Sequence, residues 1–157
     1  MKIYVSYSLA PTDLYIASML ARQAQAKGVV VETAQHIAPG SNWAAIAAHP
    51  IASSDVVVAI VSRDSQNILN VERELGIALS YSKPVLALVE HGLHAQINVP
   101  NVQYVEFDRR NLGPALARIG AILEGRKNQD NAGKWLVAGG LALLALYLIG
   151  QESEENK

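Results

Sequence analysis

The chain contains no cysteine, which excludes disulfide bonds and thiolate metal sites. It also lacks an excess of charge of either sign, because 13 Lys and Arg stand against 14 Asp and Glu, for a formal net charge of −1. Proteins that bind nucleic acid carry a basic patch or stripe, so no nucleic-acid partner is expected. Of the four histidines, only His91 and His94 are close in sequence, in an expected loop, and no metal site is predicted.

The N-terminus has no secretion signal. Lys2 is followed by a short apolar run that Ser6 already interrupts, so no hydrophobic signal core forms. Together with the lack of cysteine, this start favours a domain that stays in the cytoplasm.

Five β-rich runs alternate with helical stretches, which indicates an α/β domain with a parallel sheet and helices on both faces. The runs are Ile3–Tyr7, Val29–Thr33, Asp55–Val61, Val85–Val89 and Val102–Phe107. Asp55–Val61 is almost continuously apolar, as expected of a central strand that is covered on both faces. Val102–Phe107 contains Gln103 and Glu106, which an edge strand tolerates. We therefore expect a flavodoxin-like strand order, with the third run central and the fifth at an edge.

The helices are predicted from their end signals. The first begins near Pro11 with Thr12 as its cap and ends before Gly28. The second spans about Trp43–Ala48 and ends by Pro50, and the third spans about Val71–Ser82. The fourth spans roughly Leu112–Glu124 and is expected to stop at Gly125.

The C-terminal part has a different composition. A domain over residues 1–125 is followed by a polar linker, 126–134, an uncharged apolar segment, 135–150, and an acidic tail, 151–157. As a helix the apolar segment spans roughly 24 Å, which is short for a bilayer, but flanking polar residues can snorkel. A buried core helix or an oligomer contact is the alternative. Positive charge gathers before the segment, so we expect a single-pass, C-terminal anchor in membrane lipid with the domain in the cytoplasm.

Several blocks of residues then resemble one family. They are Ile3–Ser8, Ile37–Trp43, Ser53–Ser62, Val71–Leu79 and Lys83–Val85. In this order and spacing, over residues 2–90, they resemble TIR (Toll/interleukin-1 receptor) domains, and in particular small prokaryotic TIR proteins that cleave NAD⁺. The resemblance implies a role in antiphage immunity and self-assembly with other TIR domains. It also implies that NAD⁺ is a substrate and that no cofactor is needed.

Some TIR domains are scaffolds, whereas others cleave the nicotinamide–ribose bond with a glutamate on the helix after the central strand. Glu74 matches that position. Its helix also singles it out, because Glu74 lies on the shoulder of an otherwise apolar arc, where a carboxylate is costly. The alternative is that Glu74 only pairs with a cation such as Arg73 or Lys83. Nicotinamide leaves NAD⁺ as a neutral molecule, so one carboxylate that opposes the developing ribosyl cation is sufficient.

The other candidate contacts are weaker. Tyr7 and Ser8 follow the first strand, Gly40 forms a turn, and Trp43 either stacks on a ring or fixes the second helix to the core. Tyr81 lies near the direction of Glu74 two turns later. One departure from the family is Asn70, which stands where several NAD⁺-cleaving relatives have an aromatic one turn before the glutamate. A non-catalytic scaffold and a nucleoside deoxyribosyltransferase-like enzyme remain as alternatives.

Overall fold

The computed structural model describes residues 1–33, 41–65, 68–93 and 102–128. Met1–Glu124 forms one compact unit, and Gly125–Lys157 forms a second, of which only the end of one helix is described. The predicted candidate Gly40, most of the predicted linker and the whole apolar segment 135–150 lie outside these ranges. Within the ranges, no helix is long and apolar enough to cross a membrane.

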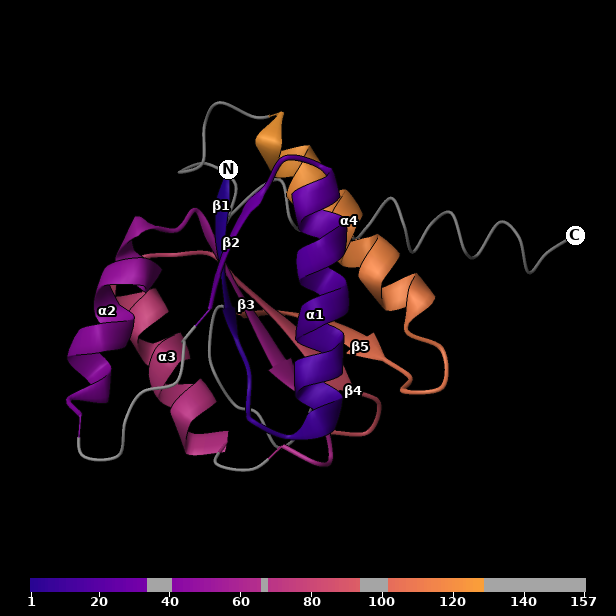
Figure 1. Ribbon diagram of the computed structural model, residues 1–157, viewed down its shortest axis with the longest axis horizontal. Coiled ribbons are helices and arrows are strands. Elements are labelled where there is room, and N and C mark those ends of the chain that lie inside the picture. Colours follow the sequence, from indigo (N-terminus) through magenta and orange to yellow (C-terminus); the bar gives the residue numbers. More distant parts are fainter. Residues whose placement is uncertain (34–40, 66–67, 94–101, 129–157) are drawn as a thin grey trace, which may run out of the picture. The chain divides into compact units, whose positions relative to one another are not determined.

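The sheet has five parallel strands in the order β2-β1-β3-β4-β5 (Figure 1). These strands are β1 (Lys2–Ser6), β2 (Val30–Thr33), β3 (Val56–Val61), β4 (Val85–Glu90) and β5 (Val102–Phe107). The predicted flavodoxin-like order is confirmed, since β3 lies between β1 and β4, and β5 lies at an edge. In this order the chain reverses direction across the sheet between β1 and β3, which is the point where such sheets bind ligands.

Helices lie on both sides of the sheet, with α2 (Trp43–Ser53) and α3 (Ile68–Ser80) together on one side (Figure 1). On the other side lie α1 (Pro11–Ala26) and α4 (Gly113–Lys127). Every residue of β3 and β4 is buried, which explains their continuous apolar sequence. One apolar cluster joins Tyr4 and alternate residues of β3 and β4 to Leu75 and Ala78 of α3.

Two helix ends differ from the sequence prediction at α1 and α4. Thr12 does not cap α1; Ala10 is the cap residue, and the Thr12 hydroxyl donates instead to Asp64 Oδ2 at 2.7 Å. The glycine that ends α1 is confirmed, because Gly28 has a φ of +71° and donates to the Gln25 carbonyl at 2.9 Å. The expected stop at Gly125 is wrong, since α4 continues to Lys127.

The ends of α2 and α3 also differ from the prediction. The expected end of α2 by Pro50 is wrong, since α2 runs through Pro50 to Ser53. The neighbouring Ile51 is fully buried, so tertiary packing offsets the local cost of proline. The helix α3 starts three residues before Val71, the expected start. It closes with Ser82 at a φ of +53°, where the Ser82 and Lys83 amides donate to the Leu79 and Ala78 carbonyls.

Candidate functional site

The carboxylate of Glu74 is held inside the domain by two hydroxyl groups. Its residue is only 2 % exposed. Tyr4 Oη donates to Glu74 Oε1 at 2.7 Å, and Ser6 Oγ donates to Glu74 Oε2. Tyr4 and Ser6 are two residues apart on β1, so both side chains leave the same face of the sheet. Each carboxylate oxygen therefore has one donor of its own.

The surroundings of Glu74 act on its pKa in opposite directions. Burial raises the pKa of the Glu74 carboxyl, and the hydrogen bonds from Ser6 and Tyr4 lower it, so that the net direction is upward. Burial, followed by the nearby Glu74 carboxylate, raises the pKa of Tyr4, so its hydroxyl stays protonated and remains a donor. Glu74 is thus a desolvated acid whose charged form depends on two neutral donors.

These partners differ from those expected from sequence. Lys83, considered as an ion-pair partner of Glu74, donates instead to the Ser54 carbonyl at 2.8 Å. Tyr7 is half-buried just after β1, and Tyr81 is exposed beyond the end of α3. Asn70 is exposed one turn before Glu74. Trp43 begins α2, but its side chain lies outside what the structure describes.

Ser8, the remaining candidate, belongs to a second buried carboxylate cluster. Asp13, in the first turn of α1, is fully buried, and its Oδ2 accepts hydrogen bonds from the hydroxyl groups of Ser8 and Ser65. Ser65 follows β3, and its hydroxyl also accepts from the Ser62 amide at 2.8 Å. Asp13 therefore joins the loop after β1 to the loop after β3, the two loops that flank the reversal point of the sheet.

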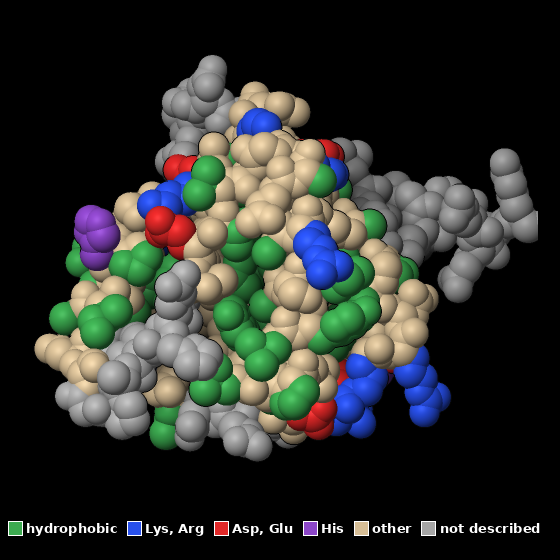
Figure 2. Space-filling view, in the orientation of Figure 1, with side chains coloured by type: hydrophobic (Ala, Val, Ile, Leu, Met, Phe, Trp, Pro, Cys, Tyr) green, Lys and Arg blue, Asp and Glu red, His purple; other side chains and the backbone are tan. Residues whose placement is uncertain are grey.

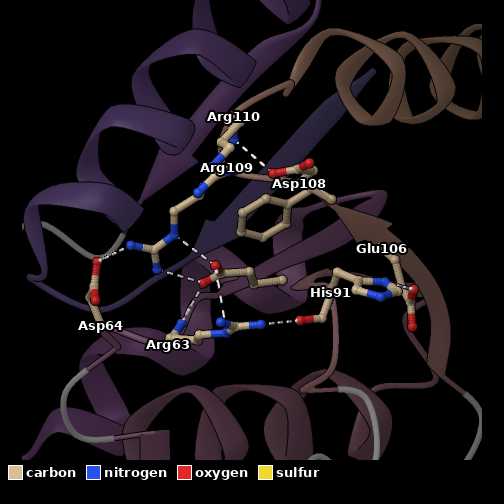
Figure 3. Close-up of a pocket in the computed structure, with 9 residues that line it drawn as sticks. Arg63, Asp64, His91, Glu106, Asp108, Arg109 and Arg110 are labelled. Atoms are coloured by element: carbon tan, nitrogen blue, oxygen red, sulfur yellow. Dashed lines mark hydrogen bonds and ion pairs between the residues drawn. The ribbon is translucent and has the colours of Figure 1, made fainter.

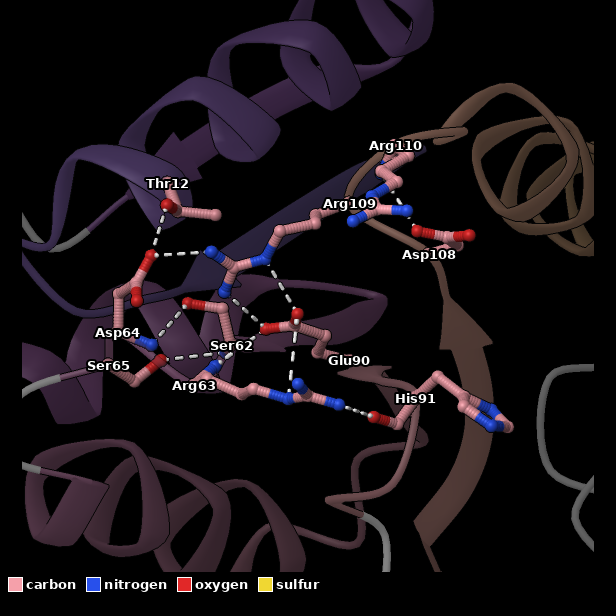
Figure 4. A network of polar contacts seen from close by, with 10 residues as sticks. All are labelled: Thr12, Ser62, Arg63, Asp64, Ser65, Glu90, His91, Asp108, Arg109 and Arg110. Atoms are coloured by element: carbon pink, nitrogen blue, oxygen red, sulfur yellow. Dashed lines mark hydrogen bonds and ion pairs between the residues drawn. The ribbon is translucent and has the colours of Figure 1, made fainter.

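A charged network occupies the carboxyl ends of β3, β4 and β5 (Figures 3 and 4). The Glu90 side chain is 5 % exposed and accepts from Arg109 Nε at 2.7 Å and from Arg109 Nη2 at 2.8 Å. The Arg63 amide donates to Glu90 Oε2 at 2.7 Å. Arg109 Nη1 lies 3.2 Å from Asp64 Oδ2. These bonds hold the pKa of Glu90 below its usual range, with Arg109 the largest cause.

The network borders a cavity of about 690 Å³ that Glu74 does not line. Its lining is polar and of mixed charge: Arg63, Asp64, Glu90, His91, Glu106, Phe107, Asp108, Arg109 and Arg110. The Arg109 guanidinium is already engaged by two carboxylates, so it is not free to bind an anion. Across the described ranges, no group of three or more acidic or histidine side chains could hold a metal ion. Glu74 therefore stays the stronger candidate for chemistry.

The sequence of the domain matches a known protein family. The TIR domain model matches residues 3–119, which covers the sheet from the second residue of β1 onward and the first half of α4. The chain belongs to the TIR domain family. No protein with a curated description matches it.

This TIR domain is also similar to a solved structure, the CMP N-glycosidase BcmB of Clostridium botulinum. The TM-score is 0.55 at 16 % sequence identity, and the match covers 77 % of this chain and 99 % of that one. At this identity the likeness shows a shared α/β fold. Family membership and fold agree with the resemblance carried by the sequence blocks.

Sequence reasoning missed Tyr4, Ser6 and Asp13 as parts of polar sites. One signal could have indicated Tyr4 and Ser6: they are polar residues two positions apart in a strand that is otherwise apolar. The pairing of Glu90 with Arg109 had a weaker signal, since both follow apolar runs that end at one edge of a parallel sheet.

Proposed function

We propose that this TIR domain cleaves the N-glycosidic bond of a nucleotide, with NAD⁺ as substrate and Glu74 as the catalytic carboxylate. The observation that carries the proposal is a buried glutamate, on the helix after the central strand, with a separate hydroxyl donor on each oxygen. A desolvated carboxylate is costly unless it is used. In a low-dielectric site its charge opposes a developing cation strongly.

The reaction needs one bond to break and one to form. The bond between ribose C1′ and the nicotinamide nitrogen breaks, and its electron pair neutralises the pyridinium, so no acid is required. Positive charge develops on the ribose ring, opposite the ionised Glu74. Water then attacks C1′ and loses a proton to solvent, giving ADP-ribose. If a group of the same nucleotide attacks instead of water, the product is a cyclised nucleotide.

The similar solved structure, BcmB, is named for a substrate other than NAD⁺. Its title states that BcmB is a CMP N-glycosidase, so both substrates share an N-glycosidic bond between a ribose and a base. Cytosine does not leave as a neutral molecule unless it is protonated, which requires an acid that Glu74 in its ionised form does not supply. This difference favours NAD⁺, and CMP is the natural second substrate to assay. A deoxyribosyltransferase-like activity would require a second base as acceptor.

One observation favours a different function. Glu74 is 2 % exposed, so a substrate reaches it only when the residues above it move. A carboxylate that never becomes accessible to a substrate fits a non-catalytic TIR scaffold that recruits other TIR domains. Incubating purified protein with NAD⁺, and separately with CMP, at several protein concentrations separates these functions. We expect nicotinamide release that grows faster than protein concentration, whereas a scaffold releases no base at any concentration.

Hydrophobic side chains gather in the middle of one face of the domain (Figure 2). Figure 1, in the same orientation, places β2 and α1 there. We propose that this face takes part in self-assembly. Exposed apolar side chains on these elements include Leu14, Tyr15 and Val30. Such residues gain free energy when a partner covers them. We propose other copies of this TIR domain as the partner. A role in antiphage immunity rests on the family resemblance alone.

We also propose that the segment 135–150 anchors the protein in a membrane, with the TIR domain in the cytoplasm. Sixteen uncharged residues follow a run that contains Arg126, Lys127 and Lys134. The full-length protein is expected to stay in the membrane fraction through high salt and carbonate, as sedimentation after each wash will measure. Truncation after Lys127, where α4 ends, should release a folded soluble domain. A full-length protein that is soluble without detergent would contradict the anchor.

A further inference from the structure

Two residues of β1 bring polar groups into a region that is otherwise apolar. Tyr4 belongs to a buried cluster whose other members are Ala, Val, Ile and Leu side chains of α2, α3, β3 and β4. Ser6 lies two positions further along the same strand and is fully buried as well. Their hydroxyl groups reach the same carboxylate, Glu74, across 70 and 68 positions of the chain.

A purely structural role explains this arrangement poorly. An apolar residue at position 74 would leave no charge to desolvate, and Phe and Ala at positions 4 and 6 would then need no partner. Instead the two donors take separate oxygens, which fixes both the position and the rotation of the carboxylate. We propose that Tyr4 and Ser6 are positioning residues that hold Glu74 ionised and oriented for the ribose. This inference rests on the proposed function.

Among the residues that the structure describes, no charged group near Glu74 takes over this task. The strand β3 carries no titratable residue. Two titratable groups on the other neighbouring elements are engaged in ion pairs, Glu32 on β2 with Lys2 and Glu90 on β4 with Arg109. His49 on α2 and Arg73 on α3 are exposed. The remaining titratable groups are Tyr7 after β1 and Glu72 on α3. The two hydroxyl groups are the contacts that lower the pKa of Glu74 against the effect of burial. Removing either one should therefore raise that pKa further.

The test removes one hydroxyl at a time, with Tyr4→Phe and Ser6→Ala. Loss of a hydrogen bond to the ionised carboxylate should raise the pKa of that carboxyl by about one unit or more. The acidic midpoint of the kcat profile should therefore rise by about one unit in each variant. At a pH below that midpoint kcat should fall about tenfold. Tyr104→Phe, on β5 against the same cluster, and Ser54→Ala, whose buried hydroxyl donates to the Ile51 carbonyl, are the matched controls. Both controls should keep the wild-type midpoint.

A direct titration of Glu74 separates this inference from the proposed activity. Carboxyl NMR of protein labelled at glutamate gives the midpoint of Glu74, whose signal is assigned by its absence in Glu74→Gln. Midpoints that rise in both variants support the positioning role. An active wild type whose Glu74 midpoint does not move in Tyr4→Phe and Ser6→Ala overturns it, whatever the stability of the variants. An inactive wild type with rising midpoints overturns the proposed activity alone.

Discussion

We expect Glu74→Gln to lower the rate of the proposed NAD⁺ cleavage by about 10²-fold or more, because the amide keeps the shape of the side chain but removes the charge that stabilises the ribosyl cation. Steady-state nicotinamide release, measured at several protein concentrations, gives the ratio. The loss should appear in kcat rather than in KM, since the interaction is made in the transition state.

Stability should move the other way in this variant. Burial raises the pKa of Glu74, so the ionised carboxyl weakens the fold at pH values above that pKa, and a neutral amide removes this cost. We therefore expect Glu74→Gln to unfold at a Tm at or above that of the wild type. Glu72→Gln is the control, because it makes the same change of charge on the same helix, half-buried and two residues away. An active Glu74→Gln protein would refute the assignment of the catalytic residue.

Replacing Arg109 by alanine lowers the Tm of the domain by about 5 °C or more. Glu90 is buried, and without Arg109 its partners among the described residues are the Arg63 amide and the Arg63 guanidinium, whose Nε lies 3.8 Å from Glu90 Oε1. A buried charge that loses its partner destabilises a fold strongly, although the partly exposed Arg109 reduces the effect through solvent screening. Thermal unfolding followed by circular dichroism measures the change.

The pH dependence identifies the cause of that loss. The folded pKa of Glu90 lies below its unfolded value, so its pairing stabilises the fold above the unfolded pKa and is lost as pH falls through the folded one. The difference in Tm between wild type and Arg109→Ala should thus shrink in acid. Arg63→Ala, whose side chain is 62 % exposed, should cost much less. An equal loss at all pH values would show that packing of the Arg109 stem, rather than charge, is responsible.

The layout of the sheet could be predicted from sequence because the burial of each strand determines which of its residues are apolar. The run Asp55–Val61 is apolar on both faces since β3 is covered on both faces, and Gln103 and Glu106 mark the edge strand β5. Helix ends were less predictable, since Pro50 lies inside α2. A local signal cannot record that the buried Ile51 offsets the cost of the proline.

The candidate site could be predicted only in part. The shoulder position of Glu74 on its helix and the family resemblance pointed to it. Its partners could not be found, because the Tyr4 and Ser6 hydroxyl groups meet it only through the register of β1 beside β3 and the packing of α3. The Asp13 cluster has the same origin, since Ser65 is 52 positions from Asp13.

The strand order also governs when the Glu74 site forms during folding. Every ladder in the sheet is parallel, so each pairing closes a long loop: Lys2 meets Val30, and Ile3 meets Val56. Such non-local pairings slow folding, because loop closure precedes the contacts that reward it. On the ribosome β1 emerges before α3. Its Tyr4 and Ser6 hydroxyl groups therefore have no Glu74 carboxylate to bind until α3, about seventy residues later, has emerged. A nascent or half-folded chain in which α3 has not packed beside β1 therefore lacks the assembled Glu74 site, so the proposed cleavage of NAD⁺ is confined to the folded domain.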